Sequence, residues 1–151
     1  MNTEDYIFAE KLLTEWLAVT SLIQNDRIVK HMSYNEALVC NYLWHRLNQE
    51  TDYMTPTELC RMTGIKKSLM NRILKSLEEK ELIIYVKNEN DRRSTPIKFN
   101  REREEDFLRE HNNSIEVVNN IVVALGKEKA ANILESLKDI NAGAKSVFGI
   151  E

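Results

Sequence analysis

The side chains best suited to chemistry in this sequence are a run of cations with no acid among them. Between Leu59 and Leu77 the sequence holds five basic residues and no carboxylate. These basic residues are Arg61, Lys66, Lys67, Arg72 and Lys75. Helical spacing gathers a polar face made of Lys67, Ser68, Asn71, Arg72 and Lys75. Such a face can neutralise phosphates and hydrogen-bond base edges. A solvated helix surface is the simpler alternative for the cations taken alone.

The charge of the chain is unevenly distributed, which supports a contact with a polyanion. The formal net charge is −3 overall. Residues 54–101 nevertheless hold 11 basic and 6 acidic side chains. Residues 1–53 hold 4 basic and 8 acidic side chains, and residues 102–151 hold 6 and 10. A basic centre between two acidic ends indicates one localised surface for nucleic acid.

Two short helices joined by a tight turn are expected to position the cationic face. Thr55 is the expected N-cap of the first helix, with Pro56 at its first position and Glu58 at its third. Gly64 is suited to the positive φ of the turn that follows. The second helix is expected over about residues 66–79. Its core-facing side chains are Met70, Ile73, Leu74 and Leu77.

A β-hairpin with a charged tip is expected next. The β-branched run 82–86 and the return segment 95–99 flank a polar stretch that contains Asp91-Arg92-Arg93. Pro96 cannot donate a ladder hydrogen bond, so the return strand is expected to be an edge strand or to be irregular there. Helix, turn, cationic helix and charged hairpin, in that order, describe a winged helix-turn-helix. In this arrangement a helix enters the major groove and the hairpin can place arginines at the adjacent minor groove.

Amphipathic helices are expected on both sides of this unit. Ser33 and Glu36 form a capping box at the start of a helix that ends near Asn48. An N-terminal helix carries a one-sided apolar stripe, made of Ala9, Leu12, Leu13, Trp16, Leu17, Thr20 and Ile23. The chain after Asn100 is expected to be helical, with a break at Gly126. Its stripes contain Ile115, Val118, Val122, Leu125, Ala130, Ile133, Leu134 and Leu137. Stripes of this length at the chain ends need a partner surface.

The central segment resembles the MarR family of bacterial regulators. The resemblance rests on TPTELCRMTGIKKSLMNRILKSLEEKELI followed by NENDRRSTPIKF, and it covers about residues 30–100. It implies an obligate homodimer made by the N- and C-terminal helices. It also implies that Arg93 enters the minor groove and that Asp91 holds the wing tip in shape. The positions that face DNA in the family are here Lys67, Ser68, Asn71, Arg72 and Lys75.

Three positions depart from the family pattern. Glu81 stands where a glycine is usual, so a positive φ at this position would cost strain. Tyr85 replaces a usual arginine near the start of the wing. Phe99-Asn100 stands in place of a Leu-Thr pair and runs directly into Arg101. The angle of the wing is therefore the part of the fold that the resemblance constrains least.

These observations predict a mainly α fold with a small β-hairpin wing. Residues 33–100 are expected to form the winged helix-turn-helix, here called the reading head, and residues 1–32 and 101–151 a helical dimerisation region. The predicted DNA-binding residues are Lys66, Lys67, Ser68, Asn71, Arg72, Lys75, Arg92 and Arg93, with Asp91 structuring the wing. The expected function is a homodimeric repressor that binds a pseudo-palindromic double-stranded operator. The alternative is a winged-helix adaptor that binds protein and not DNA.

A small aromatic effector is a further expectation from the family resemblance. In the family, aromatic acids or phenols bind in a cleft between the dimer helices and the reading head. Trp16, Tyr42 and Trp44 are the candidate pocket residues here. Packing in the core is the alternative role for each of them.

The sequence offers little support for an enzyme or a metalloprotein. It has no phosphate-binding glycine loop, nucleophile elbow or HExxH motif, and no cofactor is expected. His31, His45 and His111 are scattered, and a structural role is expected for His45. Cys40 and Cys60 lie in apolar helical patterns typical of core positions, with oxidation sensing as the alternative.

No apolar run approaches the roughly 18 residues of a membrane span. The N-terminus lacks the pattern of a signal peptide, so a cytoplasmic location is expected.

Overall fold

The computed structural model describes residues 2–27, 29, 31–86 and 95–148. The helices of the reading head are α2 (Tyr34–Arg46), α3 (Pro56–Thr63) and α4 (Lys67–Glu79). The other helices are α1 (Thr3–Leu22), α5 (Glu104–Leu125) and α6 (Lys127–Phe148). A π-helical turn, η1 (Ile23–Arg27), follows α1, and a 3₁₀ turn, η2 (Arg101–Arg103), precedes α5. The predicted mainly α fold with a winged helix-turn-helix is confirmed.

The helices of the reading head begin and end where the sequence predicts. Both capping boxes form, with Ser33 and Glu36 at α2 and with Thr55 and Glu58 at α3. Glu58 Oε2 accepts hydrogen bonds from the Thr55 backbone N–H at 2.7 Å and from its hydroxyl at 2.9 Å. Gly64 ends α3 with a φ of 71°, in the left-handed region that glycine adopts without a Cβ penalty. The turn between α3 and α4 is therefore set by local chemistry.

The sheet has one strand more than the sequence predicts. The strands β1 (Tyr53–Met54), β2 (Ile83–Tyr85) and β3 (Ile97–Phe99) are antiparallel, in the spatial order β1-β3-β2. The return strand β3 is thus central, so of the two alternatives predicted for it an edge strand is wrong, and an irregularity at Pro96 is what the structure has. Pro96 stays outside the ladder because it lies just before β3, where its carbonyl accepts a 2.7 Å hydrogen bond from the Val86 N–H. Two-residue β1 was missed because so short a strand carries no alternation pattern.

The core lies between α2, α3, α4 and the sheet. Its largest fully buried side chains are Phe99, Leu43, Met54, Leu59, Met70, Leu74, Leu77, Ile83, Ile97, Val39 and Cys40. Beyond the reading head, α5 contributes Phe107, which is 2% exposed and meets the Phe99 ring at a centroid distance of 5.3 Å. Phe107 is thus the apolar contact that attaches α5 to the core.

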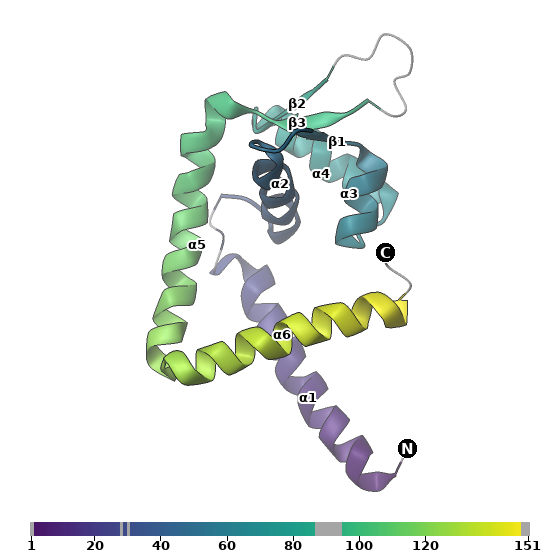
Figure 1. Ribbon diagram of the computed structural model, residues 1–151, viewed down its shortest axis with the longest axis vertical. Coiled ribbons are helices and arrows are strands. Elements are labelled where there is room, and N and C mark those ends of the chain that lie inside the picture. Colours follow the sequence, from purple (N-terminus) through teal and green to yellow (C-terminus); the bar gives the residue numbers. More distant parts are fainter. Residues whose placement is uncertain (1, 28, 30, 87–94, 149–151) are drawn as a thin grey trace.

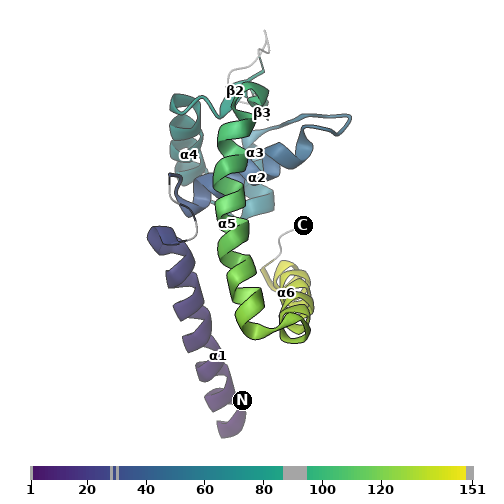
Figure 2. The same ribbon diagram turned by 90° about the vertical axis from the view of Figure 1, so that its left-hand side faces the viewer.

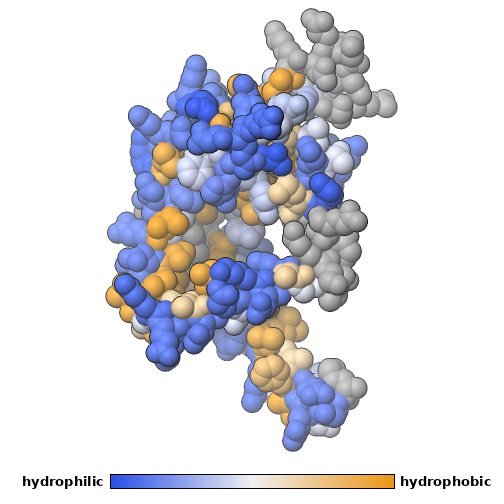
Figure 3. All heavy atoms as spheres, in the orientation of Figure 1, coloured by the Kyte–Doolittle hydropathy of each residue, from blue (hydrophilic) through white to orange (hydrophobic). Residues whose placement is uncertain are grey.

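The helices α1, α5 and α6, here called the terminal arms, project from the reading head. α5 and α6 meet at a corner, and α1 leads away on its own (Figures 1 and 2). α1 has no buried residue, and its exposed apolar side chains include Tyr6, Ile7 and Phe8 as well as Leu12, Leu13, Trp16 and Leu17 of the predicted stripe. Its apolar surface is therefore broader than one stripe. Apolar side chains also gather around the α5–α6 corner (Figure 3). Among the described residues, no helix is long and apolar enough to cross a membrane.

Candidate nucleic-acid interface

The recognition helix α4 separates a buried apolar face from an exposed polar face. Met70, Ile73, Leu74 and Leu77 are at most 5% exposed, as predicted from their spacing. The predicted DNA-binding residues of this segment are all exposed, namely Lys66, Lys67, Ser68, Asn71, Arg72 and Lys75. Lys66 is the N-cap residue and makes no side-chain capping bond. The buried face holds the helix while the polar face remains accessible.

The acids near this face lie at the C-terminal end of α4. Lys75 Nζ is 3.9 Å from Glu79 Oε1, one turn further along the helix. Both side chains are well exposed, so this pair is weak and can give way to a phosphate contact. The N-terminal part of the helix therefore carries the strongest positive character.

An open hollow of about 1070 Å³ adjoins the polar face. α4 contributes Lys67 and Asn71 to its lining, α3 contributes Thr57, and the base of the hairpin contributes Tyr85 and Thr95. Burial, and the nearby carboxylate of Glu78, raise the pKa of Tyr85. Tyr85 is therefore a neutral hydrogen-bonding group at this position, where the family usually has an arginine.

The tip of the wing contains the other predicted DNA contacts. Asp91, Arg92 and Arg93 lie outside the described residues. The strands on either side are paired from Ile83↔Phe99 to Tyr85↔Ile97, which confirms the predicted hairpin at its base. The roles assigned to the three tip residues stay predictions.

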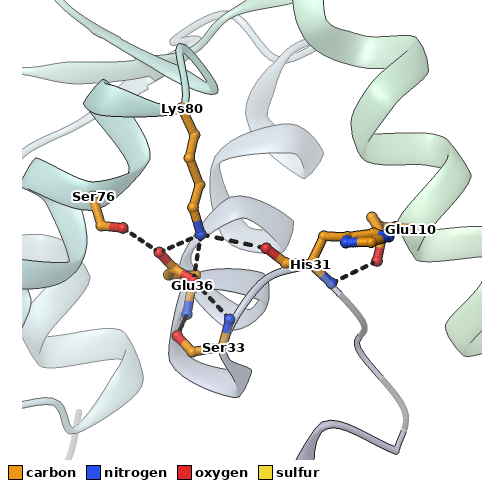
Figure 4. A network of polar contacts seen from close by, with 6 residues as sticks. All are labelled: His31, Ser33, Glu36, Ser76, Lys80 and Glu110. Carbon is orange, nitrogen blue, oxygen red and sulfur yellow. Dashed lines mark hydrogen bonds and ion pairs between the residues drawn. The ribbon is translucent and has the colours of Figure 1, made fainter.

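A buried polar network supports the C-terminal end of α4 (Figure 4). The Glu36 carboxylate, on α2, accepts hydrogen bonds from Ser76 Oγ at 2.6 Å and from Lys80 Nζ at 2.9 Å to each oxygen. Burial alone would raise the pKa of Glu36. The hydrogen bonds from Ser76, Lys80 and the Ser33 N–H outweigh burial, and the pKa lies below its usual value. Sequence spacing identified the Ser33 cap but gave no sign of Ser76 or Lys80.

The three predicted effector-pocket residues lie in two different environments. Tyr42 and Trp44 are partly buried on α2 and pack against the core. Trp44 donates a 3.0 Å hydrogen bond from Nε1 to Glu104, and its ring lies 5.6 Å from that of Phe107. Trp16 lies on α1, which leads away from the reading head, and is 47% exposed. The structure thus places Tyr42 and Trp44 on one helix of the reading head and Trp16 on a separate arm.

The histidines and cysteines have structural neighbours. His45 and His111 both lie against the Trp44 ring, at 4.9 and 5.5 Å. His31 is paired with Glu110 at 3.6 Å. The described residues contain no cluster of three His, Cys, Asp or Glu side chains that could hold a metal. Burial, and then the nearby Glu36, raise the pKa of Cys40 to about 12, so this thiol is an unreactive core group. Cys60 is partly exposed beside the hollow.

Comparison with solved structures identifies the fold. BldR, a transcriptional regulator from Sulfolobus solfataricus, is 15% identical, with a TM-score of 0.70 over 94% of this chain and 99% of its own. RdhR, an organohalide-sensing transcriptional regulator solved with 2,4-dichlorophenol, is 18% identical, with a TM-score of 0.72 over 95% and 85%. MarR from E. coli is 16% identical, with a TM-score of 0.58 over 93% and 96%. At these identities the likeness shows the fold.

Comparison of sequences gives a family match over the central segment. No curated protein matches the chain. The family model described as MarR family matches residues 39–94, which contain β1, α3, α4, β2 and most of α2. The match falls on the segment whose motifs carry the resemblance, and the arrangement of helices around it is that of the solved structures. Residues 39–94 thus match the MarR family, and the chain has the winged-helix fold of these solved regulators.

Proposed function

We propose that the protein is a sequence-specific regulator that binds double-stranded DNA as a homodimer. The observation that carries the proposal is the exposed polar face of α4, with its cations and without a carboxylate from Leu59 to Leu77, on a winged-helix frame. A protein-interaction adaptor has no need for such a face.

We assign recognition of the DNA base sequence to α4. Asn71 has an amide that can form two hydrogen bonds with an adenine edge, and Ser68 can donate to either kind of base pair. The flanking cations Lys67, Arg72 and Lys75 are assigned to phosphates, where they fix register without reading sequence. Arg92 and Arg93 of the wing tip are assigned to the adjacent minor groove, with Asp91 as a structuring residue. Binding is expected to weaken steeply with salt, because each neutralised phosphate releases counterions.

Dimerisation is assigned to residues 1–32 and 101–151. Their apolar side chains are exposed in one chain, for example Leu13 at 56%, Ile121 at 50% and Leu134 at 54%. Burial of a leucine of this kind is worth about 1.5–3 kcal/mol. A second copy of the chain offers the same apolar surfaces, which suits a twofold-symmetric interface. Two reading heads related in this way match half-sites about 34–36 Å apart on a pseudo-palindromic duplex.

Repression and release by an effector complete the proposal. A dimer bound over a promoter excludes the transcription machinery, so repression is the expected outcome. RdhR was solved with a chlorinated phenol bound, and a small aromatic molecule is proposed as the effector here. Trp16, Tyr42 and Trp44 are the candidate contacts. Because Trp16 lies on a terminal arm, the pocket is expected to be complete only in the dimer.

The test is selection of bound duplexes from a random pool at two salt concentrations. We expect an enriched inverted repeat and weaker binding at the higher salt. Asn71→Ala should change the preferred bases, whereas Arg93→Ala should weaken binding to most sequences. Lys138→Ala is the matched control, because Lys138 is an exposed cation of α6 paired with Glu135 at 2.7 Å. Recovery of no enriched sequence by the wild-type protein would contradict the proposal and favour the adaptor.

A further inference from the structure

Three consecutive residues after the recognition helix are held from two sides. Lys80, Glu81 and Leu82 connect α4 to β2. Their contacts with Glu36 on one side and with Asn100 and Arg103 on the other are here called the exit clasp. The first side ties the end of α4 to α2, and the second ties it to the start of α5.

The first side of the clasp is a buried, charge-assisted contact. Glu36 is 6% exposed, and both of its oxygens accept from Lys80 Nζ at 2.9 Å. Lys80 Nζ also lies 3.4 Å from the backbone carbonyl of His31, in the segment that leads from the N-terminal arm into α2 (Figure 4). The His31 N–H in turn donates to Glu110 of α5 at 3.3 Å. This side therefore joins α2, α4 and the segment after α1.

The second side of the clasp lies where the chain enters α5. Glu81 has a φ of 59°, which turns the backbone sharply after α4. Its carbonyl accepts from Asn100 Nδ2 at 2.8 Å, and the Leu82 carbonyl accepts from the Asn100 N–H at 2.9 Å. The Glu81 carboxylate contacts the Arg103 guanidinium. Glu81 and Asn100, two of the positions that depart from the family pattern, thus bind each other.

The clasp supplies directional contacts that apolar packing does not. Phe107 is the buried residue of α5 and lies one turn beyond Arg103. An apolar contact at one point favours burial but not a particular angle, whereas hydrogen bonds are directional. The clasp, together with the hydrogen bond from Trp44 to Glu104, adds polar points of attachment beside Phe107 and can therefore fix the angle between α5 and the recognition helix.

The length of α5 makes this angle important. Its 22 residues span about 33 Å at 1.5 Å per residue. A rotation of about 6° at the clasp moves the far end of such an arm by about 3.4 Å, the rise of one base pair. If the far ends are joined in a dimer, the same rotation changes the separation of the two recognition helices by a comparable amount.

We propose that the exit clasp sets the separation of the two half-sites that the dimer accepts, with Glu81, Asn100 and Arg103 as positioning residues. This inference rests on the proposed function as a DNA-binding dimer. In this proposal the three residues determine which half-site separations the dimer tolerates, and they do not contact DNA.

The experiment measures binding to duplexes that carry the selected half-sites with the spacer lengthened or shortened by one base pair. Wild type should prefer one spacing by about tenfold, a penalty of the size of a base mismatch. Arg103→Ala should reduce this preference to about twofold, because the angle of α5 is no longer fixed. Arg109→Ala is the matched control: both arginines pair with Asp106, at 3.3 and 3.4 Å, but Arg103 is the one that also contacts Glu81. The control should keep the tenfold preference.

Each outcome decides a separate point. Loss of stability alone would lower binding to every spacer equally, so the ratio between spacers distinguishes positioning from folding. Glu81→Gln keeps the size of the side chain, and it replaces Arg103→Ala if that variant does not fold. A wild-type preference that persists in both variants would overturn the inference while leaving the proposed function intact. Absence of binding by wild type to any spacer would overturn both.

Discussion

The reading head and the terminal arms both contain amphipathic helices, but the apolar face is buried in the reading head and exposed in the arms. In α4, Leu74 and Leu77 are at most 2% exposed. In α6, Leu134 and Leu137 recur at a similar spacing but are 54% and 48% exposed. Both patterns are typical of a helix with one covered face. The difference lies in where the cover comes from: the chain itself covers this face of α4, and we propose that a second copy covers that of α6.

This comparison separates the two regions by the origin of their stability. The reading head packs three helices against a sheet and has its own core, so its helices are held by contacts within the chain. Phe107 is the buried apolar side chain that α5 packs against the core, and most of the stability of a helix in a protein comes from packing of its apolar face. The arms are therefore expected to depend on the dimer, and the predictions below test this division.

The largest effect is expected in the core of the reading head. Leu77→Ala should lower the free energy of unfolding by about 2–5 kcal/mol, because it removes buried methyl groups and leaves a cavity. Lys75→Ala is the control, since it lies on the exposed face of the same helix, where substitutions change stability by less than about 0.5 kcal/mol. Urea unfolding followed by circular dichroism measures both. A loss below about 1 kcal/mol for Leu77→Ala would show that the core relaxes around the cavity.

The next effect is expected in the terminal arms. Leu134→Asp should weaken the dimer by at least about 3 kcal/mol, roughly 150-fold in Kd, because a dimer loses two buried leucines. The control is Asn132→Asp, which places the same charge on the opposite face of α6. Sedimentation equilibrium over a range of concentrations measures the Kd of each protein. Equal dimer stability in the two variants would mean that the α6 stripe is covered by something other than a second copy.

Sequence reasoning succeeded where local chemistry determines the structure. The capping boxes at Ser33 and Thr55, the turn at Gly64 and the two faces of α4 each depend on residues within one or two turns of each other. The same holds for the break at Gly126, where φ is 82°. Such features can be predicted because the interacting groups are neighbours in the sequence.

Sequence reasoning was less complete where distant segments meet. β1 exists because Tyr53 and Met54 pair with Lys98 and Ile97, and two residues hold no periodic signal. The contacts of Glu36 with Ser76 and Lys80 span 40 and 44 residues. The departure at Glu81 was noted in the sequence, and the positive φ considered there is confirmed. Its partners Asn100 and Arg103 were not identifiable, because they meet Glu81 only after the sheet has formed.

A smaller effect is expected at Glu36, which lies on α2 within the reading head. Glu36→Gln should cost about 1–3 kcal/mol, since it weakens hydrogen bonds to a buried carboxylate. The pKa of Glu36 is lowered in the folded protein. Its contribution to stability is therefore present above the unfolded pKa, about 4.3, and is lost as the pH falls through the lower folded value. Unfolding free energies measured from pH 7 down to about 3 should show wild type and variant converging in acid. A constant difference across this range would contradict the assigned role of the charge.

The smallest effect is expected at Glu81, where the reading head joins α5. A left-handed conformation costs a non-glycine residue about 1–2 kcal/mol. Replacement by glycine removes this cost, but part of the gain is lost because glycine makes the unfolded chain more flexible and so stabilises the unfolded state. In the wild-type background, Glu81→Gly also removes the contact with Arg103, a partly exposed pair worth less than about 1 kcal/mol. The two effects should nearly cancel.

In an Arg103→Ala background the contact is already absent, so Glu81→Gly should stabilise the folded protein by about 0.5–1 kcal/mol. Thermal unfolding of the four proteins forms a double-mutant cycle. A coupling of zero would mean that the Arg103 contact contributes nothing to stability. The join between the two regions would then be held by Asn100, Phe107 and the hydrogen bond from Trp44 to Glu104.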